Sequence, residues 1–301
     1  MLCCTDLPPA SRNRSRSKRS PSMNMRPVAA LAVIGVTSPT AAIAQTPSPL
    51  AEWQYSAGIT LEQVYEPETP AWSVRVGAGM AFQPFYDGSS RYRVLAGPSI
   101  DIRYRNLFFL STGDGAGVNF LSGRNWRLAF AVTYDLGRRE QTDYEHLYGL
   151  GNINPAPVLK LFGDYVISKT FPLDIRADIR RNLGGADGWI GDIGAYLPLP
   201  GSSETFFWFA GPSVTFADST YMNSWFGVNA TQAAHSRYPQ YRASAGVKSY
   251  GLGVSATWLP AKHWIVNTVT ALQQLVGSAA HSPITQRAAG VEVSVSVDYE
   301  F

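Results

Sequence analysis

The chain has 301 residues, of which 45% are hydrophobic and 16% charged, and it contains 27 glycines and 15 tyrosines. Low charge combined with abundant glycine and aromatic residues is unusual for a soluble enzyme and favours strands joined by turns. The formal net charge of +3 arises in residues 1–44, which carry +5 and leave about −2 for the remainder. A nucleic-acid partner, which needs basic residues gathered on one face, is therefore not expected.

The N-terminal segment has the order of a secretory signal. Arg26 precedes an apolar run from Val28 to Val36, and Ala42-Ile43-Ala44 follows before Gln45. This run is too short for a membrane-spanning helix, which needs roughly 20 apolar residues. We expect cleavage after Ala44, so that residues 1–44 are a signal peptide with an atypical basic N-terminal extension and residues 45–301 form the mature domain.

The extension contains basic residues ahead of two methionines, Met23 and Met25, each of which would start a normal signal. We interpret it as the product of an upstream start. The two cysteines, Cys3 and Cys4, both lie in it, so residues 5–301 have no disulfide, zinc–thiolate cluster or thiol nucleophile. Because no later segment reaches 18 consecutive apolar residues, an exported chain of this kind is periplasmic, secreted or an outer-membrane barrel.

Period-two alternation runs through the body and predicts β-strands. In the segment from Val291 to Phe301, apolar residues alternate with Glu292, Ser294, Ser296, Asp298 and Glu300. The same pattern appears from Trp126 to Leu136 and from Leu173 to Arg180, where the polar positions carry alternating charges. Strands of this type separate a lipid-facing surface from a hydrated interior.

Twelve strands are predicted in this way: 53–63, 72–82, 92–104, 107–120, 126–137, 156–168, 172–182, 188–198, 204–216, 241–258, 263–275 and 290–301. Most are long enough for a tilted bilayer crossing of about 9 to 11 residues. The longest connections, 138–155, 217–240 and 276–289, then all lie at one end, as outer-membrane barrels require. Two connections fit poorly, since 105–106 is a short turn on the long-loop side and 83–91 is a long one on the other.

We therefore predict an all-β fold, a transmembrane antiparallel up-and-down β-barrel of about 12 strands from Trp53 to Phe301, in the outer membrane of a Gram-negative cell. A soluble sandwich or lipocalin-like barrel also alternates. Against it stand the inward charges, the terminal aromatic Phe301, and tryptophans near strand ends where interfacial girdles form, namely Trp53, Trp72, Trp126, Trp189, Trp225, Trp258 and Trp264.

Several segments of the body form distinctive motifs: PFYDGSSRYRVLAGP (84–98), LYGLGNI (147–153), LFGDY (161–165), LGGADG (183–188), AGPSVTFADSTYMNSWFGV (210–228), GVKSYGLGVSATWLPAKHWIV (246–266) and SPITQ (282–286). Through these motifs the body resembles the MipA/OmpV family of outer-membrane proteins (the MltA-interacting protein family). The segment 210–228 is the most specific. His281 departs from the acid expected before SPI, and the basic extension before Met23 is atypical.

This resemblance implies an outer-membrane location. For some members it implies a scaffold that links a murein hydrolase, the lytic transglycosylase MltA, with a peptidoglycan synthase of the penicillin-binding protein class. Other members are described as adhesins or as envelope proteins tied to antimicrobial stress. The family brings no catalytic motif and no defined partner-binding residues, so none is carried over.

No catalytic, cofactor-binding or metal-binding residues are predicted. The histidines His146, His235, His263 and His281 show no metal-ligand spacing. The nearest enzymatic candidate is His146 with Asp143 and Glu145, but no matched nucleophile accompanies it. The glycine-rich strings at 113–117 and 183–188 lack the lysine and following helix of a phosphate-binding loop, and we interpret them as turns.

Charged residues predicted to face inward leave two alternatives open: a lumen plugged by ion pairs, or a narrow pore. These residues are Asp101, Arg103, Asp135, Asp174, Arg176, Asp178, Arg180, Asp192, Glu292 and Asp298. A barrel of about twelve strands is wider than the eight-stranded barrels that side chains fill, so a hydrated lumen is plausible. We favour the plugged interior. The expected function is that of a non-enzymatic scaffold protein in the lipid bilayer, with a narrow channel or an adhesin-like surface protein as the alternative.

Overall fold

The computed structural model describes residues 71–301 of the chain. The predicted signal peptide, residues 1–44, and the predicted strand 53–63 lie outside the described residues. No helix within residues 71–301 is both long and apolar enough to cross a membrane.

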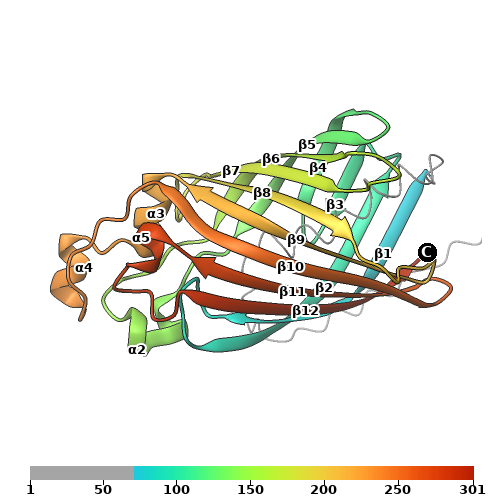
Figure 1. Cartoon of the computed structure of the whole chain (residues 1–301). Helices are drawn as coiled ribbons and strands as arrows, with labels where there is room; N and C mark the ends of the chain where they lie inside the picture. The colour runs from blue at the N-terminus through green and yellow to red at the C-terminus, as the bar shows by residue number, and fades with distance from the viewer. Residues whose placement is uncertain (1–70) are drawn as a thin grey trace, which may run out of the picture. The chain divides into compact units, whose positions relative to one another are not determined.

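Twelve antiparallel strands form a closed barrel in which each strand pairs with its sequence neighbours and β1 pairs with β12 (Figure 1). The strands are β1 (Trp72–Pro84), β2 (Tyr92–Tyr104), β3 (Phe108–Ser111), β4 (Gly115–Ser122), β5 (Trp126–Asp135), β6 (Ala156–Val166), β7 (Asp174–Asn182), β8 (Trp189–Pro198), β9 (Phe206–Ala217), β10 (Gly246–Ala261), β11 (Trp264–Leu275) and β12 (Ala289–Glu300). Because the ring is closed, paired strands leave no free sheet edge wherever both neighbours run their full length. A bilayer could not form hydrogen bonds with such an edge.

All helices of the described chain gather at one end of the barrel, and the C-terminus lies at the other (Figure 1). They are the 3₁₀ helix η1 (Glu140–Asp143), α2 (Tyr144–Leu147), α3 (Ser219–Phe226), α4 (Ala230–His235) and α5 (Gly277–Ala280). The Asp218 side chain caps α3 by accepting from the backbone N–H of Tyr221, and Asn229 with Gln232 forms a capping box on α4. Local capping therefore gives the long loops defined structure.

One predicted strand, 107–120, is wrong. The chain forms instead a tight hairpin of β3 and β4, with a turn at 112–114. Gly115 adopts a φ of +85° there, which glycine tolerates and other residues rarely do. Alternation on both sides of this glycine hid the reversal from the sequence pattern.

The start of the barrel also differs from the prediction. Among the described residues the ring closes between β1 and β12, so the described wall begins at Trp72. Together the split of 107–120 and the later start keep the count at twelve and change the loop assignment: 85–91 lies at the end with the helices, and 105–107 becomes a short turn at the opposite end. Both connections that fitted poorly in the sequence now agree with the rule for outer-membrane barrels.

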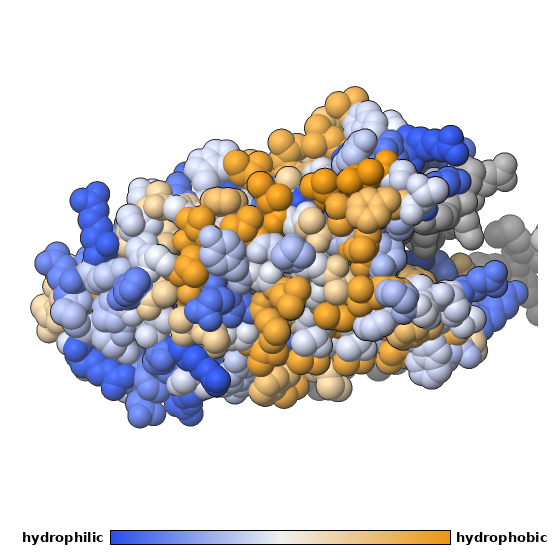
Figure 2. Space-filling model, in the orientation of Figure 1, coloured by the Kyte–Doolittle hydropathy of each residue, from blue (hydrophilic) through white to orange (hydrophobic). Residues whose placement is uncertain are grey.

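The outer surface of the wall is apolar. Figure 2 shows hydrophobic residues gathered across the middle of the visible face of the barrel, with hydrophilic residues toward its two ends. Exposed aromatic residues mark the two borders of the apolar surface: Trp72, Trp126, Trp258 and Trp264 lie near the short turns, and Tyr134, Trp189 and Tyr250 near the long loops. Of the predicted girdle residues, Trp225 is an exception, because it lies in α3 within the loops.

The opposite face of each strand points into the barrel and carries the buried polar residues. Asp174, Arg176, Arg180 and Asn182 of β7 are buried, whereas Ile175 and Ile179 are exposed. The alternation predicted for residues 126–136, 173–180 and 291–301 is confirmed. The interior is therefore largely polar, and the apolar clusters beyond the wall pack under the long loops.

Candidate functional site: the barrel lumen and its loop cap

The half of the lumen nearer the short turns contains five buried charged residues, which we call the ion-pair layer: Asp114, Arg127, Lys160, Asp164 and Arg176. Arg127 Nε lies 2.7 Å from Asp164 Oδ2, and Lys160 Nζ lies 3.2 Å from Asp114 Oδ1. Arg176 bridges the two pairs, at 3.3 Å from Asp114 Oδ1 and 3.5 Å from Asp164 Oδ1. Three cations and two carboxylates from the β3–β4 turn and from β5, β6 and β7 thus form one network.

An aromatic ring sits among these cations. Phe162 of β6 has Lys160 Nζ and Arg176 Cζ each 4.8 Å from its ring centroid, and Arg127 Cζ at 5.4 Å. Phe109 of β3 packs edge-on against Phe162, at 5.9 Å between centroids. The ring face offsets part of the excess positive charge through cation–π attraction.

A second group of ion pairs lies beside this layer. Arg180 of β7 contacts Asp178 at 3.0 Å and also binds Asp192 of β8. Asp192 in turn accepts a hydrogen bond from the Thr215 hydroxyl of β9. On β2, Arg103 Nε lies 2.8 Å from Asp101 Oδ1. Among the inward charges predicted from the sequence, Asp101, Arg103, Arg176, Asp178, Arg180 and Asp192 therefore take part in ion pairs.

Asp114, Lys160 and Asp164 are lumen residues that the sequence analysis did not single out. Lys160 and Asp164 alternate with Leu161 and Tyr165 along β6, so the period-two pattern contains their signal. Asp114 belongs to the glycine-rich string at 113–117, where the sequence indicates only a turn. That turn lies inside the barrel wall and not at its rim, which places Asp114 beside Lys160.

A small chamber of about 140 Å³, lined by both polar and apolar residues, lies between these ion pairs and the long loops. Lys248 of β10 lines one side of the chamber and forms an ion pair with Asp87, with 2.7 Å between Lys248 Nζ and Asp87 Oδ2. Asp135 of β5 accepts a 2.7 Å hydrogen bond from the Asn182 side-chain amide, and Glu292 also contributes to the lining. Chambers of this volume hold a few water molecules or a group the size of a benzene ring.

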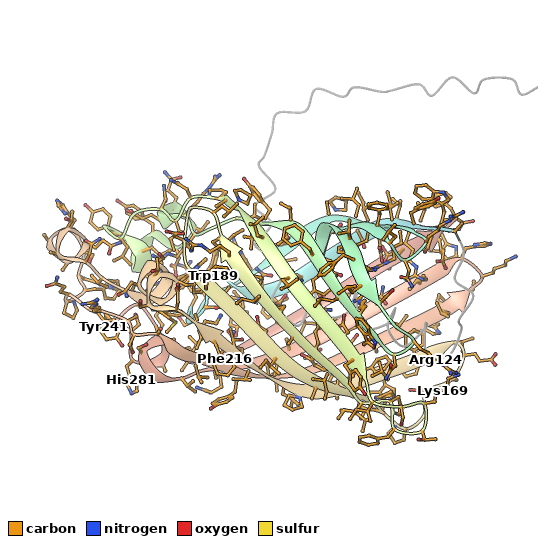
Figure 3. All side chains as sticks on the ribbon, turned by 90° about the horizontal axis from the view of Figure 1, so that it is seen from above. Arg124, Lys169, Trp189, Phe216, Tyr241 and His281 are labelled. Carbon is orange, nitrogen blue, oxygen red and sulfur yellow. The ribbon has the colours of Figure 1, made fainter. Side chains whose placement is uncertain are left out.

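Above the chamber, the long loops form a packed cap, defined here as residues 85–91, 136–155, 218–245 and 276–288. Tyr86, Phe226, Met222 and Ile284 are almost fully buried in it. Ser282 Oγ donates to the Phe226 carbonyl at 2.6 Å, so loops far apart in the sequence are joined. Figure 3 shows Tyr241 and His281 at this end of the barrel and Arg124 and Lys169 at the opposite end.

A buried arginine links the cap to the wall. Arg138 follows β5 and donates through Nη1 to the Trp225 carbonyl at 2.9 Å, with its guanidinium 5.8 Å from the Tyr86 ring centroid. Burial lowers the pKa of Arg138 to about 10. Burial also raises the pKa of the Tyr86 and Tyr221 phenols above their ordinary value of 10.0, with nearby carboxylates adding to the effect. These tyrosines therefore act as neutral hydrogen-bonding and packing groups.

The pair that most resembles a catalytic arrangement forms part of the cap. His146 Nδ1 lies 2.9 Å from Asp143 Oδ1, and Arg91 Nη1 lies 3.1 Å from the same oxygen. Arg91 also contacts Glu145 at 3.6 Å. The buried Asp143 thus joins the loop 85–91 to the loop 136–155, which gives it a role in holding the two together.

The other histidines lie apart from one another. His235 and His281 each place Nδ1 2.7 Å from a carbonyl of their own helix, and His263 stacks on Tyr299 at 5.5 Å. Within residues 71–301 no group of three or more His, Cys, Asp or Glu side chains is arranged to hold a metal ion. The glycines at 184, 185 and 188 adopt positive φ in the turn between β7 and β8, as predicted for that string.

A closed antiparallel barrel with an apolar outer band, aromatic borders and a charged interior is an outer-membrane β-barrel protein. The family model described as "MltA-interacting protein MipA" matches residues 76–301, and the chain belongs to this family. Both findings agree with the fold, family and outer-membrane location expected from the sequence.

Solved structures with a similar course of the chain are outer-membrane barrels. The translocator domain of the autotransporter NalP from Neisseria meningitidis has 14% identity and a TM-score of 0.39 over 80% of this chain and 93% of that one. The CymD monoaromatic hydrocarbon channel has 8% identity and a TM-score of 0.39 over 81% and 91%. OprD from Pseudomonas aeruginosa has 10% identity and a TM-score of 0.33 over 76% of this chain, which spans 65% of OprD. No curated protein matches the sequence.

Proposed function

We propose that this barrel is a non-catalytic scaffold that links a murein hydrolase of the lytic transglycosylase class to a peptidoglycan synthase of the penicillin-binding class. The observation that carries the proposal is the ion-pair layer under a packed loop cap. Side chains that form buried ion pairs fill the space through which solutes would pass. The barrel is then a rigid anchor whose working surface is one of its ends.

We assign partner binding to the end of the barrel that carries the short turns, because this end is basic. Its turns present the exposed basic residues Arg105, Arg124, Lys169 and Lys262, against the acidic Glu204. With the long loops outside the cell, this end faces the periplasm, where the cell-wall enzymes work. A basic rim attracts an acidic surface, and such rim charges act mainly on the association rate and its salt dependence.

Co-purification tests the proposal. The full-length protein is solubilised from envelopes in mild detergent, captured, and its partners are identified by mass spectrometry. We expect a lytic transglycosylase and a penicillin-binding protein, with recovery that falls as salt rises. The double variant Arg124→Glu, Lys262→Glu should recover less of both, whereas Arg139→Glu in the loop cap should recover as much as wild type. Absence of both enzymes, or equal loss in the control, would contradict the scaffold.

A second candidate function is a narrow channel, which the chamber favours. A hydrated space lined by Asp87, Lys248 and Glu292 is what a conduction path would use above the ion-pair layer. Single-channel recording in planar bilayers separates the two functions. The scaffold proposal expects no steady current from purified wild-type protein, and a reproducible open level would overturn it in favour of the channel.

A further inference from the structure

The short β3–β4 hairpin leaves the barrel wall incomplete on one side. β3 pairs with β2 only along Asp101–Tyr104, although β2 continues to Tyr92. β4 pairs with β5 as far as Val132, although β5 continues to Asp135. We call the opening above the turn 112–114, between residues 94–98 of β2 and residues 133–135 of β5, the notch. The contacts of Arg91 with Asp143 and Glu145 bridge the loops at its outer border.

The notch lies at the depth of the hydrocarbon region. Val94 is level with Phe82 on β1, which in turn is level with Val293 on β12. These side chains point outward, and the neighbouring outward positions of β1 and β12 are also apolar. Val94 is 64% exposed, and Ala96, Gly97 and Pro98 are exposed in succession, which is expected where a strand has lost its neighbour.

The free edge of β2 presents backbone polar groups to this opening. The Ile100 amide donates to Thr112 Oγ1 at 2.9 Å, and the Ile100 carbonyl accepts from the Thr112 amide at 2.8 Å. Because backbone groups alternate between the two edges of a strand, Ala96 and Val94 direct theirs to the same open side. Pro98 has no N–H to satisfy, as is typical of proline on an edge strand. Unpaired groups at this depth call for a polar occupant, since lipid tails offer no hydrogen bonds.

The lumen side of the notch supplies space and a positive charge. A Cβ atom at Gly97 would meet none of the described residues within 4 Å, so the described wall leaves space on the lumen side there. Arg93, on the same face of β2 as Asp101, has a buried Nε without a hydrogen-bond partner among the described residues, and its guanidinium lies 5.6 Å from the Phe85 ring centroid. In the described chain no carboxylate pairs with Arg93, unlike the other lumen-facing arginines of the wall, Arg75, Arg103, Arg127, Arg176 and Arg180.

We propose that the notch binds an acidic lipid of the outer leaflet, whose phosphate reaches Arg93 while its acyl chains stay in the bilayer beside Val94 and Tyr134. The phosphate pairs with the guanidinium, which is suited to bidentate phosphate recognition. Polar atoms of the headgroup accept from the backbone N–H groups of Val94 and Ala96. A lipid enters laterally, so the packed cap is no obstacle. The inference is independent of the scaffold role, because it concerns the wall at the opposite end from the basic rim.

Photocrosslinking in nanodiscs tests the proposal. The protein is reconstituted with phosphatidylglycerol carrying a diazirine in the acyl chain or, in a parallel sample, with the matching diacylglycerol, which lacks the phosphate, and adducts are mapped by mass spectrometry. We expect phosphatidylglycerol adducts concentrated on residues 94–98 and 133–135, and lost by about tenfold in Arg93→Gln, since hydrogen bonds to charged groups contribute about 1.5–3 kcal/mol. The control Arg124→Gln makes the same charge change at the other end of the barrel and should leave these adducts unchanged.

A second variant blocks the space without changing the charge. Gly97→Phe places a ring where the described wall leaves space, and it should abolish the notch adducts while heat-modifiable gel mobility shows a folded barrel. Equal labelling by the two lipids, or wild-type labelling in Arg93→Gln, would overturn the proposal whether or not Gly97→Phe folds.

Another occupant would be the chain's own N-terminal segment. With Cys3 and Cys4 replaced by serine, a Val94→Cys variant carries a single thiol for a photoactivated crosslinker. Efficient crosslinks from this thiol to residues 45–70 would show that the segment fills the notch and would overturn lipid binding. Absence of such crosslinks, together with the lipid adducts, supports it.

Discussion

Asp114, in the turn of the short β3–β4 hairpin, lies 3.2 Å from Lys160 of β6, and both side chains are almost fully buried. The contact joins the interrupted part of the wall to β6 by passing over β5 on the lumen side. The contact also favours a turn of the hairpin at this depth, because the Asp114 carboxylate pairs with the cations of the ion-pair layer there.

Removal of the Asp114 charge should destabilise the barrel strongly. Asp114→Asn leaves Lys160 and Arg176 buried without this carboxylate, and breaking a buried pair in this way costs about 3–5 kcal/mol. Urea unfolding in lipid vesicles, followed by tryptophan fluorescence, measures the loss. The control Asp187→Asn breaks the partly exposed pair with Arg181, which should cost less than about 1 kcal/mol. Similar losses for the two variants would contradict a central role for the ion-pair layer.

Replacement of both members of that pair should open the lumen. Asp114→Ser with Lys160→Ser removes a cation and an anion together, so no new uncompensated charge remains while side-chain volume is lost. We expect a measurable current in planar bilayers from this variant and none from wild type. The surface pair variant Arg181→Ser, Asp187→Ser serves as the control and should stay silent. A silent lumen variant that is folded would mean that the loop cap alone closes the barrel.

The loop cap should loosen when its buried arginine is lost. Arg138→Met keeps most of the apolar stem and removes the donor to the Trp225 carbonyl, a hydrogen bond from a charged group that contributes about 1.5–3 kcal/mol. Limited proteolysis of intact cells should then cut within residues 218–245 sooner than in wild type. The neighbouring Arg139 is exposed, so Arg139→Met should leave the cleavage rate as it is.

The orientation of the barrel can be read with single cysteines. With Cys3 and Cys4 replaced by serine the chain has no thiol, so there is no background. His281→Cys at the helix-bearing end should react with a membrane-impermeant maleimide in intact cells, and Arg124→Cys should react only after the outer membrane is permeabilised (Figure 3). The reverse pattern would place the long loops in the periplasm and remove the geometric support for the basic rim as a partner surface.

Much of the wall was predictable because lipid on one side and a polar lumen on the other impose a strict period of two. Ten of the predicted ranges each correspond to one strand. The hairpin β3–β4 was not predictable by this rule, since residues 107–120 alternate before and after the turn. The order of the connections did contain a signal: the short connection 105–106 on the long-loop side indicated that one reversal of the chain had been missed.

The sequence predicted that charged residues face the lumen, but it did not predict which of them form ion pairs. Alternation places Lys160, Asp164 and Arg176 inside, yet it gives no partners, because pairing across the lumen depends on the relative height of strands far apart in sequence. Asp114 shows this limit of the sequence pattern, because the glycine-rich string that contains it predicts a turn at the surface. The cap was missed for a similar reason: Arg138, Asp143 and Tyr86 come from loops, where neither periodicity nor strand register fixes a position.

At the outer border of the notch, side-chain charges connect the two sides of the wall. Everywhere else along the wall, neighbouring strands are held by ladders of backbone hydrogen bonds, which salt barely affects. Over the notch the two sides meet through Arg91, whose side chain is 51% exposed, and the carboxylates of Asp143 and Glu145. Salt screens charges that lie more than about 8 Å apart at physiological ionic strength, and it affects closer, partly buried pairs much less. The 3.6 Å contact of Arg91 with the exposed Glu145 is therefore the more salt-sensitive of the two, whereas the 3.1 Å contact with the fully buried Asp143 keeps this stretch of the rim together.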